Sequence, residues 1–312
     1  MKYIFGIDVG GTTIKFGLFD SEGKLLEKWE IVTNTDNKGE SIISDIGDSV
    51  NDKIKEKAID KSDILGIGID VPGPVVKSTT VLECVNLGWG LKHVSKELGD
   101  LLDIEVRVGN DADVAALGEM WQGGGKGFDS IFMVTLGTGV GGGVVVDGKI
   151  VTGSHGTAGE IGHVTVNTEE SLVCNCGKPG CLEQYASATG ITRLGNELLE
   201  KSNEPSSLRD YDELSSKAIF DEAKAGDKLA LELADEFGRV LGLALSFVAS
   251  LIDPEIFVIG GGVSKAGDII IDLTKEHYKN NVMKSIKDTE FKMAELGNDA
   301  GIYGCAKMVI TD

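Results

Sequence analysis

The sequence is poor in basic residues and has no long apolar run. It contains 30 Lys and Arg against 50 Asp and Glu, which gives a formal net charge of −20 at pH 7. A chain this acidic is a poor partner for a nucleic-acid backbone or an anionic membrane surface. No apolar stretch is long enough to cross a bilayer, and the strand-like beginning Tyr3–Ile7 lacks the regions of a signal peptide. The sequence therefore argues against nucleic acid and membrane as partners and predicts a cytoplasmic protein.

Proline is also scarce, with 5 residues against 43 glycines, and the glycines gather in clusters. Clustered glycines let the backbone approach a ligand closely. The 312 residues, of which 41% are apolar, are enough for two domains with a sizeable core. We place a small α/β domain at residues 1–109 and a large α/β domain with the metal site at 110–299. A C-terminal helix, 300–312, is expected to pack back on the first domain.

A glycine turn follows the first strand. Asp8-Val9-Gly10-Gly11-Thr12-Thr13 separates that strand from Ile14–Asp20, whose alternation of apolar and polar residues predicts a returning strand. The Walker pattern is absent, and the dinucleotide motif needs a helix after its glycines. Backbone N–H groups and threonine hydroxyls in such a turn can bind phosphate oxygens, and Asp8 is placed to hold Mg²⁺ through water. A plain hairpin turn is the alternative.

The same plan recurs in the middle of the chain. Ile131–Leu136 reads as a strand, residues 137–143 as a turn of sequence Gly-Thr-Gly-Val-Gly-Gly-Gly, and Val144–Val146 as the returning strand. A hairpin repeated in two α/β halves indicates a duplicated domain whose glycine turns grip a polyphosphate. A third glycine run, Gly260–Gly262, follows the apolar Ile256–Ile259 and can lie against a nucleotide base or ribose, with a close strand-to-helix crossing as the alternative.

Polar residues end the strand predicted at Ile104–Val108. Asn110 and Asp111 stand at its carboxyl end, where ligands of α/β proteins gather, although one of them could merely cap the helix predicted at Ala112–Met120. The loop Asn86-Leu87-Gly88-Trp89 places a Trp beside polar residues. Such a Trp can stack on a sugar, but core packing is the commoner use of Trp.

Three of the five cysteines lie close together, in the pattern Cys174-x-Cys176-x4-Cys181, and His163 precedes them. These four side chains could close one tetrahedral site, and a structural zinc ion is the economical interpretation. Unligated or disulfide-bonded thiols are the alternative, and nothing in the sequence suggests the export that favours disulfides. Glu160 and Glu183 flank the site, so a metal there would also fix two carboxylates. Cys84 and Cys305 stand alone among apolar residues and are predicted to lie in the core.

Taken in order, these motifs resemble the ROK family of repressors, open reading frames and sugar kinases. The set comprises Asp8-Val9-Gly10-Gly11-Thr12, Gly109-Asn110-Asp111, the glycine-rich residues 137–143, Glu160-Ile161-Gly162-His163 and Cys174-x-Cys176-Gly177-x2-Gly180-Cys181-x-Glu183. The resemblance covers nearly the whole chain and is strongest to the bacterial glucokinases of that family. It implies a two-domain, actin-like (ribonuclease-H-like) α/β fold with a duplicated β-hairpin phosphate-binding plan, and a homodimer.

The resemblance further implies ATP-dependent phosphorylation of glucose to glucose 6-phosphate, with Asp111 as general base on the 6-hydroxyl. It assigns the sugar to Gly73, Asn86, Asn110, Asp111, Glu160, His163 and Glu183. It assigns ATP, which binds with Mg²⁺, to Asp8, Gly10, Gly11, Thr12, Thr13, Lys15, Gly137, Thr138, Gly139, Gly261 and Gly262. It assigns a structural Zn²⁺ to His163, Cys174, Cys176 and Cys181.

Three alternatives stay open. Other ROK kinases act on N-acetylmannosamine, N-acetylglucosamine, fructose, mannose or allose and share these motifs. A sugar-sensing repressor would carry a DNA-binding helix-turn-helix before the first strand, whereas this acidic chain starts that strand at Tyr3 and keeps the predicted base. An actin-like ATPase without a sugar substrate would not need the metal stretch with its flanking Glu160 and Glu183.

Overall fold

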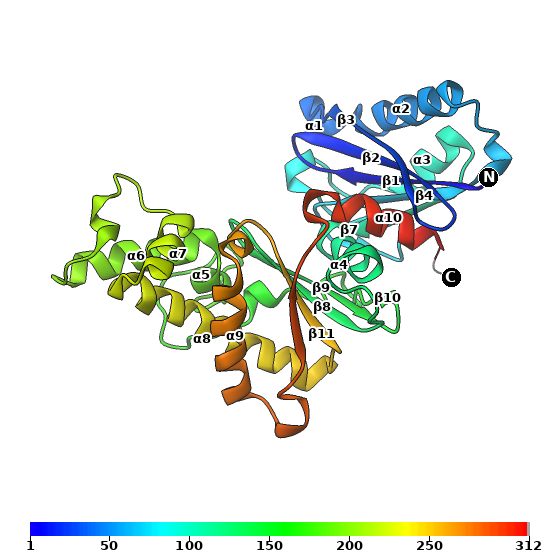
Figure 1. Cartoon of the computed structure of the whole chain (residues 1–312). Helices are drawn as coiled ribbons and strands as arrows, with labels where there is room; N and C mark the ends of the chain where they lie inside the picture. The colour runs from blue at the N-terminus through cyan, green and yellow to red at the C-terminus, as the bar shows by residue number, and fades with distance from the viewer. Residues whose placement is uncertain (311–312) are drawn as a thin grey trace. The chain divides into compact units, whose positions relative to one another are not determined.

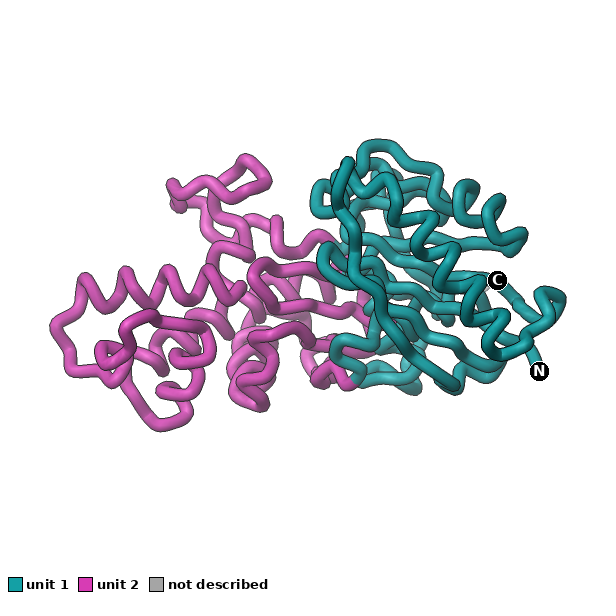
Figure 2. The backbone as a smooth tube through the Cα atoms, turned by 90° about the horizontal axis from the view of Figure 1, so that it is seen from above, with its two compact units in different colours: residues 1–129, 143–159, 296–312 teal, residues 130–142, 160–295 magenta. Residues whose placement is uncertain are grey.

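The computed structural model describes residues 1–310 and divides the chain into two compact units (Figures 1 and 2). Unit 1 comprises residues 1–129, 143–159 and 296–312, and unit 2 comprises residues 130–142 and 160–295. Unit 1 thus continues past residue 109, where the first domain was predicted to end. It includes the helix Asp111–Gln122. The last two residues of the predicted helix 300–312 lie outside the described part of the chain.

Unit 1 contains a five-stranded sheet in the order β3-β2-β1-β4-β7. Its strands are β1 (Tyr3–Val9), β2 (Thr13–Asp20), β3 (Leu25–Val32), β4 (Ile64–Val71) and β7 (Val106–Asn110). β1 pairs antiparallel with β2, as predicted for the first hairpin, and parallel with β4, which is parallel to β7. The carboxyl ends of three neighbouring strands therefore lie at one edge, where Asp8, Asp70 and Asn110 stand.

The helices of unit 1 cover both faces of this sheet. They are α1 (Asp36–Gly39), α2 (Ile42–Glu56), α3 (Val94–Leu102), α4 (Asp111–Gln122) and α10 (Ala300–Ile310). The remaining elements are β5 (Val75–Val76), β6 (Thr80–Val81), η1 (Lys61–Asp63), η2 (Val85–Leu87) and η7 (Gly297–Asp299). The predicted helix with isoleucines at helical spacing is α2, which buries Ile42, Ile46, Val50 and Ile54 in the core.

Alternate residues of β1 and β4 face different helices. Phe5 and Ile7 belong to the core cluster that includes α2, whereas Ile4 packs with Ile302 and Ala306 of α10. Cys84 and Cys305 are buried as predicted. Trp89 is 4% exposed and its Nε1 donates to the Gly39 carbonyl at 3.0 Å, so the core-packing alternative for this Trp is confirmed.

Helix α10 lies directly on the sheet of unit 1 (Figure 1) because glycines occupy the strands beneath it. A Cβ atom at Gly6 would come 2.2 Å from the Ile302 carbonyl oxygen, and one at Gly68 would come 1.9 Å from that of Cys305. Helix α4 crosses α10 equally closely, since a Cβ at Gly304 would lie 1.8 Å from the Val114 carbonyl oxygen. These contacts leave no space for a side chain.

A second five-stranded sheet has the order β10-β9-β8-β11-β12. Its strands are β8 (Ile131–Leu136), β9 (Val140–Val146), β10 (Lys149–Ile150), β11 (Ile256–Gly260) and β12 (Glu290–Met293). β9 starts at Val140 and not at the predicted Val144, so the residues 141–143 belong to the strand. The turn is shorter than predicted because the Gly137 N–H donates to the Gly139 carbonyl at 2.9 Å and closes it within three residues.

Unit 2, which contains β8, β11, β12 and the first three residues of β9, is otherwise mostly helical. Its helices are α5 (Glu183–Ala186), α6 (Ala188–Lys201), α7 (Ser216–Ala225), α8 (Lys228–Ile252), α9 (Asp268–Asn281), η3 (Ile161–His163), η4 (Ser207–Asp210), η5 (Val263–Ala266) and η6 (Lys284–Ile286). The predicted apolar stripe of α8, including Leu233, Phe237 and Leu241, is buried. None of the helices in residues 1–310 combines the length and the apolar character that a transmembrane span requires.

Replacing Gly68 by Ala tests the close packing of α10. We expect Gly68→Ala to lower the free energy of unfolding by about 2 kcal/mol, because the new methyl group forces backbone atoms apart. Urea unfolding followed by tryptophan fluorescence measures this in unit 1, which holds all three Trp residues of the chain. Gly90→Ala is the matched control, since no atom lies within 4 Å of its Cβ position. Equal stability of the two variants would contradict the packing described.

Candidate active site

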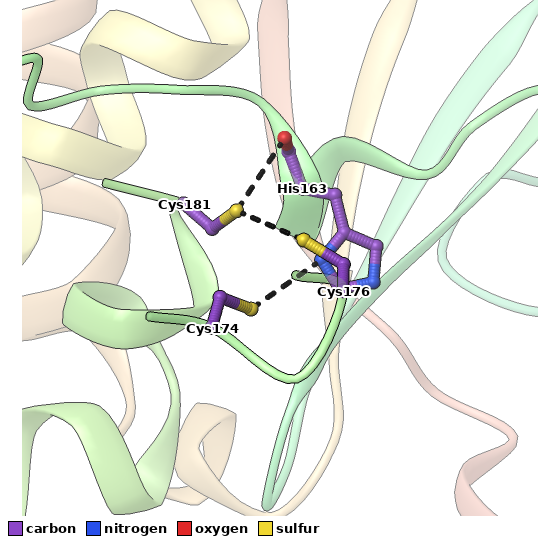
Figure 3. A group of neighbouring side chains, drawn as sticks. All are labelled: His163, Cys174, Cys176 and Cys181. Atoms are coloured by element: carbon purple, nitrogen blue, oxygen red, sulfur yellow. Dashed lines mark hydrogen bonds between the residues drawn. The ribbon is translucent and has the colours of Figure 1, made fainter. Parts of the chain in front are cut away.

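The four predicted metal ligands converge in unit 2 (Figure 3). One ligand atom each from His163, Cys174, Cys176 and Cys181 lies within 4.8 Å of all the others, and within residues 1–310 this is the one such group of three or more His, Cys, Asp or Glu residues. The Sγ atoms of Cys176 and Cys181 are 3.4 Å apart, and Cys174 Sγ is 3.8 Å from His163 Nδ1. Three thiolates and an imidazole are a donor set of structural zinc sites. The cluster therefore fits one Zn²⁺ ion.

The thiols of this cluster differ in acidity. Burial, and after it the neighbouring thiols of Cys176 and Cys174, raise the pKa of Cys181 to about 12. The pKa of the exposed Cys176 is lowered, first by a hydrogen bond from the backbone of Lys178. Because a thiol binds zinc as thiolate, metal binding must displace the Cys181 proton, and zinc affinity should fall as pH falls.

Glu183, the first residue of α5, joins the cysteine loop to the glycine turn. Its Oε2 accepts a hydrogen bond from the Val140 N–H at 3.1 Å, and its Oε1 lies 3.9 Å from Cys174 Sγ. A Cβ at Gly139 would lie 2.2 Å from that Oε2, so a side chain at position 139 would displace the carboxylate. Glu160 precedes η3, is exposed, and its carbonyl accepts from the His163 N–H at 3.1 Å.

The glycine turn at residues 137–139 is held by the start of α6. The Ala188 N–H donates to the Gly137 carbonyl at 2.8 Å, and Thr189 Oγ1 donates to the Thr138 carbonyl at 2.7 Å. Gly261, in left-handed backbone conformation with φ of 88°, packs so closely on β8 that its Cβ would lie 2.5 Å from Leu136 backbone atoms. The predicted nucleotide-binding glycines of unit 2 are therefore brought together. Gly262 beside them faces open space.

The first glycine turn is a closed hairpin in unit 1. The Gly10 N–H donates to the Thr13 carbonyl at 3.0 Å, and Thr33 donates through its backbone to the Thr12 carbonyl at 2.9 Å. Lys15 Nζ lies 2.9 Å from Asp8 Oδ2. A Cβ at Gly11 would lie 3.8 Å from Asn86, so the turn and the Asn86 loop are neighbours.

Asn110 performs the capping role that was left open. Its Oδ1 accepts from the backbone N–H groups of Ala112 at 3.0 Å and Asp113 at 3.3 Å, which caps α4. Its Nδ2 donates to the Gly73 carbonyl at 3.1 Å, and this bond ties the segment Pro72-Gly73-Pro74, which follows β4, to the start of α4. Asp111 is the first residue of α4, and its exposed carboxylate accepts from the Ala112 N–H at 2.9 Å.

Asp70 lies near the predicted site residues but was not predicted to be one of them. This residue is fully buried, lies opposite Asp8 in the register of β1 and β4, and accepts a hydrogen bond from Cys305 Sγ at 3.3 Å. Burial, and after it the charges of Asp8 and Asp111, raise the pKa of Asp70 well above its usual value. The available signal was an aspartate at the end of an apolar strand, the same position that Asp8 holds in its own strand.

Zinc content tests the metal centre. We expect one zinc ion per chain in the purified protein and its loss in Cys176→Ser, because a serine hydroxyl is a poor zinc ligand. Elemental analysis by mass spectrometry measures both. Cys84→Ser is the control, since Cys84 lies in the core of unit 1, and it should keep the zinc. Full zinc content in Cys176→Ser would remove Cys176 from the site.

Comparison with known proteins agrees with this geometry. The model of the ROK family matches residues 4–312. A glucokinase of Halalkalibacterium halodurans is 43% identical over 308 residues, which cover 97% of this chain and 93% of that protein. A xylose repressor of Caldicellulosiruptor bescii is 30% identical and is matched over 78% of its length by 99% of this chain. A ROK family glucokinase from Streptomyces griseus, solved in complex with glucose and AMPPNP, is 31% identical, with a TM-score of 0.73 and 98% of each chain covered.

The predicted two-domain actin-like α/β fold is thereby confirmed, and the chain belongs to the ROK family.

Proposed function

We propose that the chain is an ATP-dependent hexose kinase that, with Mg²⁺, phosphorylates glucose to glucose 6-phosphate. The observation that carries the proposal is the junction in unit 2 of a zinc-binding cysteine loop with a glycine turn through Glu183. The similarity to the glucokinase of H. halodurans and to the S. griseus enzyme bound to glucose and AMPPNP favours glucose as the sugar and ATP as the donor.

Asp111 is the proposed general base. A sugar hydroxyl is a poor nucleophile, and a carboxylate that accepts its proton helps the bond to the γ-phosphorus to form. Asp111 is exposed at the first turn of α4, so a bound hydroxyl can reach its carboxylate. Asn110 and Gly73, joined by a hydrogen bond, and the nearby Asn86 are the proposed sugar-binding groups of unit 1.

Unit 2 contributes Glu160, His163 and Glu183 to the sugar in this proposal. Carboxylates and imidazole suit a neutral sugar because they accept and donate hydrogen bonds to hydroxyl groups. Zinc bound by His163, Cys174, Cys176 and Cys181 would hold the imidazole ring and the loop before Glu183 in place. The metal has a structural role here and takes no part in the transfer.

The donor nucleotide is assigned to the glycine turns. In unit 1 these are Asp8 with the residues 10–13 and Lys15, and in unit 2 the residues 137–139 with Gly261 and Gly262. A pocket of about 600 Å³ beside α6 begins at Thr189, which bonds the Gly137–Gly139 turn, and continues past Asn196 and Glu200 to Ser215. A volume of this size accommodates a small ligand such as a nucleoside. We assign this pocket to the nucleoside end of ATP.

The family resemblance also underlies two further parts of the proposal. The chain is proposed to work as a homodimer and in the cytoplasm, where glucose phosphorylation opens sugar breakdown.

The function is tested by ATP consumption with Mg²⁺ and a panel of glucose, mannose, fructose, N-acetylglucosamine and N-acetylmannosamine. We expect glucose to give the highest kcat/KM, and Asp111→Asn to lower kcat at least ~100-fold because general-base help is lost. Asp113→Asn, at a neighbouring position of α4, is the control and should keep most of the activity. Absence of sugar-dependent turnover in folded, zinc-loaded protein would exclude the kinase and favour a regulatory, sugar-binding role.

A further inference from the structure

One side chain of α5 holds both ends of the segment that carries the three cysteine ligands. Gln184 follows Glu183 in this helix and is 9% exposed. Its Oε1 accepts a hydrogen bond from the Cys181 N–H at 3.0 Å, and its Nε2 donates to the Leu172 carbonyl at 2.7 Å. Leu172 lies two residues before Cys174, the first cysteine of the cluster, and Cys181 is the last. One amide group therefore joins the start of the cysteine loop, residues 172–181, to its end.

The two bonds of Gln184 call for an amide at this position. The Cys181 N–H needs an acceptor and the Leu172 carbonyl needs a donor, and the glutamine side chain supplies one of each. An ionised carboxylate offers acceptors alone, and an aliphatic side chain offers neither. Cys181 is completely buried, so loss of the acceptor would leave its N–H unpaired and away from water, which is costly.

A second set of contacts reaches the same loop from Tyr185, the next residue of α5. Its hydroxyl donates to Glu170 Oε2 at 2.7 Å and accepts from Asn167 Nδ2 at 2.9 Å. Glu170 Oε1 in turn accepts from the backbone N–H groups of Ser171 at 2.8 Å and Leu172 at 2.9 Å. None of these bonds uses a cysteine thiol or a histidine ring nitrogen, so none of them competes with metal binding.

These contacts bear on how tightly the loop can bind a metal. Ligands carried by a mobile loop lose conformational freedom when the ion binds, and this loss weakens the affinity. Bonds that fix the ends of the loop beforehand reduce the loss. With Leu172 and Cys181 held on α5, the metal has only the residues between them to order.

We propose that Gln184 is a positioning residue for the zinc centre: its amide holds the two ends of the cysteine loop in the arrangement that brings the ligands together, before the ion binds. Gln184 is not itself a ligand, and it acts through the backbone of Cys181 and Leu172. The consequence for the sugar rests on the proposed function, which assigns His163 and Glu183 to glucose.

Zinc affinity, measured by competition with a chromogenic chelator, tests the proposal without requiring turnover. Gln184→Leu should raise the zinc Kd at least ~10-fold, as loss of an outer partner of a metal site commonly does. At limiting zinc the variant should also bind glucose more weakly than the wild type in isothermal titration calorimetry. Saturating zinc should restore the wild-type glucose Kd, because Gln184 acts through the metal centre.

Tyr278→Phe is the matched control. Tyr278 is a completely buried residue of α9 in unit 2, and its hydroxyl donates to the Ile286 carbonyl at 2.8 Å. The change therefore removes a side-chain bond to the backbone elsewhere in the same unit, and zinc and glucose affinity should stay as in the wild type. A wild-type zinc Kd in Gln184→Leu would overturn the proposal. An equal loss of zinc affinity in Tyr278→Phe, or a glucose Kd of Gln184→Leu that stays raised at saturating zinc, would overturn it too.

Two further measurements keep the test decisive. Should Gln184→Leu fail to fold, amide hydrogen exchange in the wild type takes its place: the Cys181 N–H should stay protected after a chelator removes the zinc, and exchange at the rate of an unfolded chain would overturn the proposal. Glucose binding by the zinc-loaded wild type separates the two levels of inference. Its absence would refute the sugar assignment of the proposed function, while the zinc Kd of Gln184→Leu would still decide the role of Gln184.

Discussion

The hydrogen bond between the Glu183 carboxylate and the Val140 N–H is the contact on which unit 2 depends, because it joins the metal loop to the glycine turn. The loop before Glu183 has little regular structure, and isolated bridges at Cys181 and Val173 are its pairings with neighbouring backbone. A bound metal would supply the rigidity that the backbone lacks. From Glu183 the connection continues into α6, since Ser187 Oγ donates to the Glu183 carbonyl at 2.6 Å and α6 in turn bonds the turn at Gly137. The cysteine loop, Glu183 and the glycine turn at residues 137–139 are thus joined by a continuous set of hydrogen bonds.

Unit 1 reaches a comparable rigidity by backbone packing. Glycines at positions 6 and 68 let α10 rest on the strands, and those strands deliver Asp8 and Asp70 to the edge where α4 begins with Asp111. The acidic groups have different surroundings: Asp111 is exposed, Asp8 is ion-paired, and Asp70 is buried. Three aspartates within one small region therefore lie in three different environments.

Much of this could be predicted from the sequence because the signals are local. Alternating and continuous apolar runs identified the strands, and the spacing of His163 and the three cysteines identified a cluster that the structure assembles. What could not be predicted depends on distant parts of the chain. Asp70 is buried beneath α10, a helix much later in the chain. Cys305 of α10, whose Sγ donates to Asp70, lies 235 residues after it. Likewise the early start of β9 at Val140 involves Glu183, because the Glu183 carboxylate accepts a hydrogen bond from the Val140 N–H. The double role of Asn110 required the Gly73 carbonyl, which comes from another strand end.

The most direct test of the link between metal loop and sugar is the glucose affinity of zinc-loaded Glu183→Gln, measured by isothermal titration calorimetry with zinc content determined on the same sample. Glutamine keeps an oxygen that can accept from the Val140 N–H but removes the charge that strengthens a hydrogen bond from a sugar hydroxyl. If Glu183 binds the sugar, the variant should keep its full zinc content and its glucose Kd should rise about 10-fold, because a hydrogen bond to a charged group is lost. An unchanged glucose Kd at full zinc content would contradict this role, because Glu183 would then support the loop without binding the sugar.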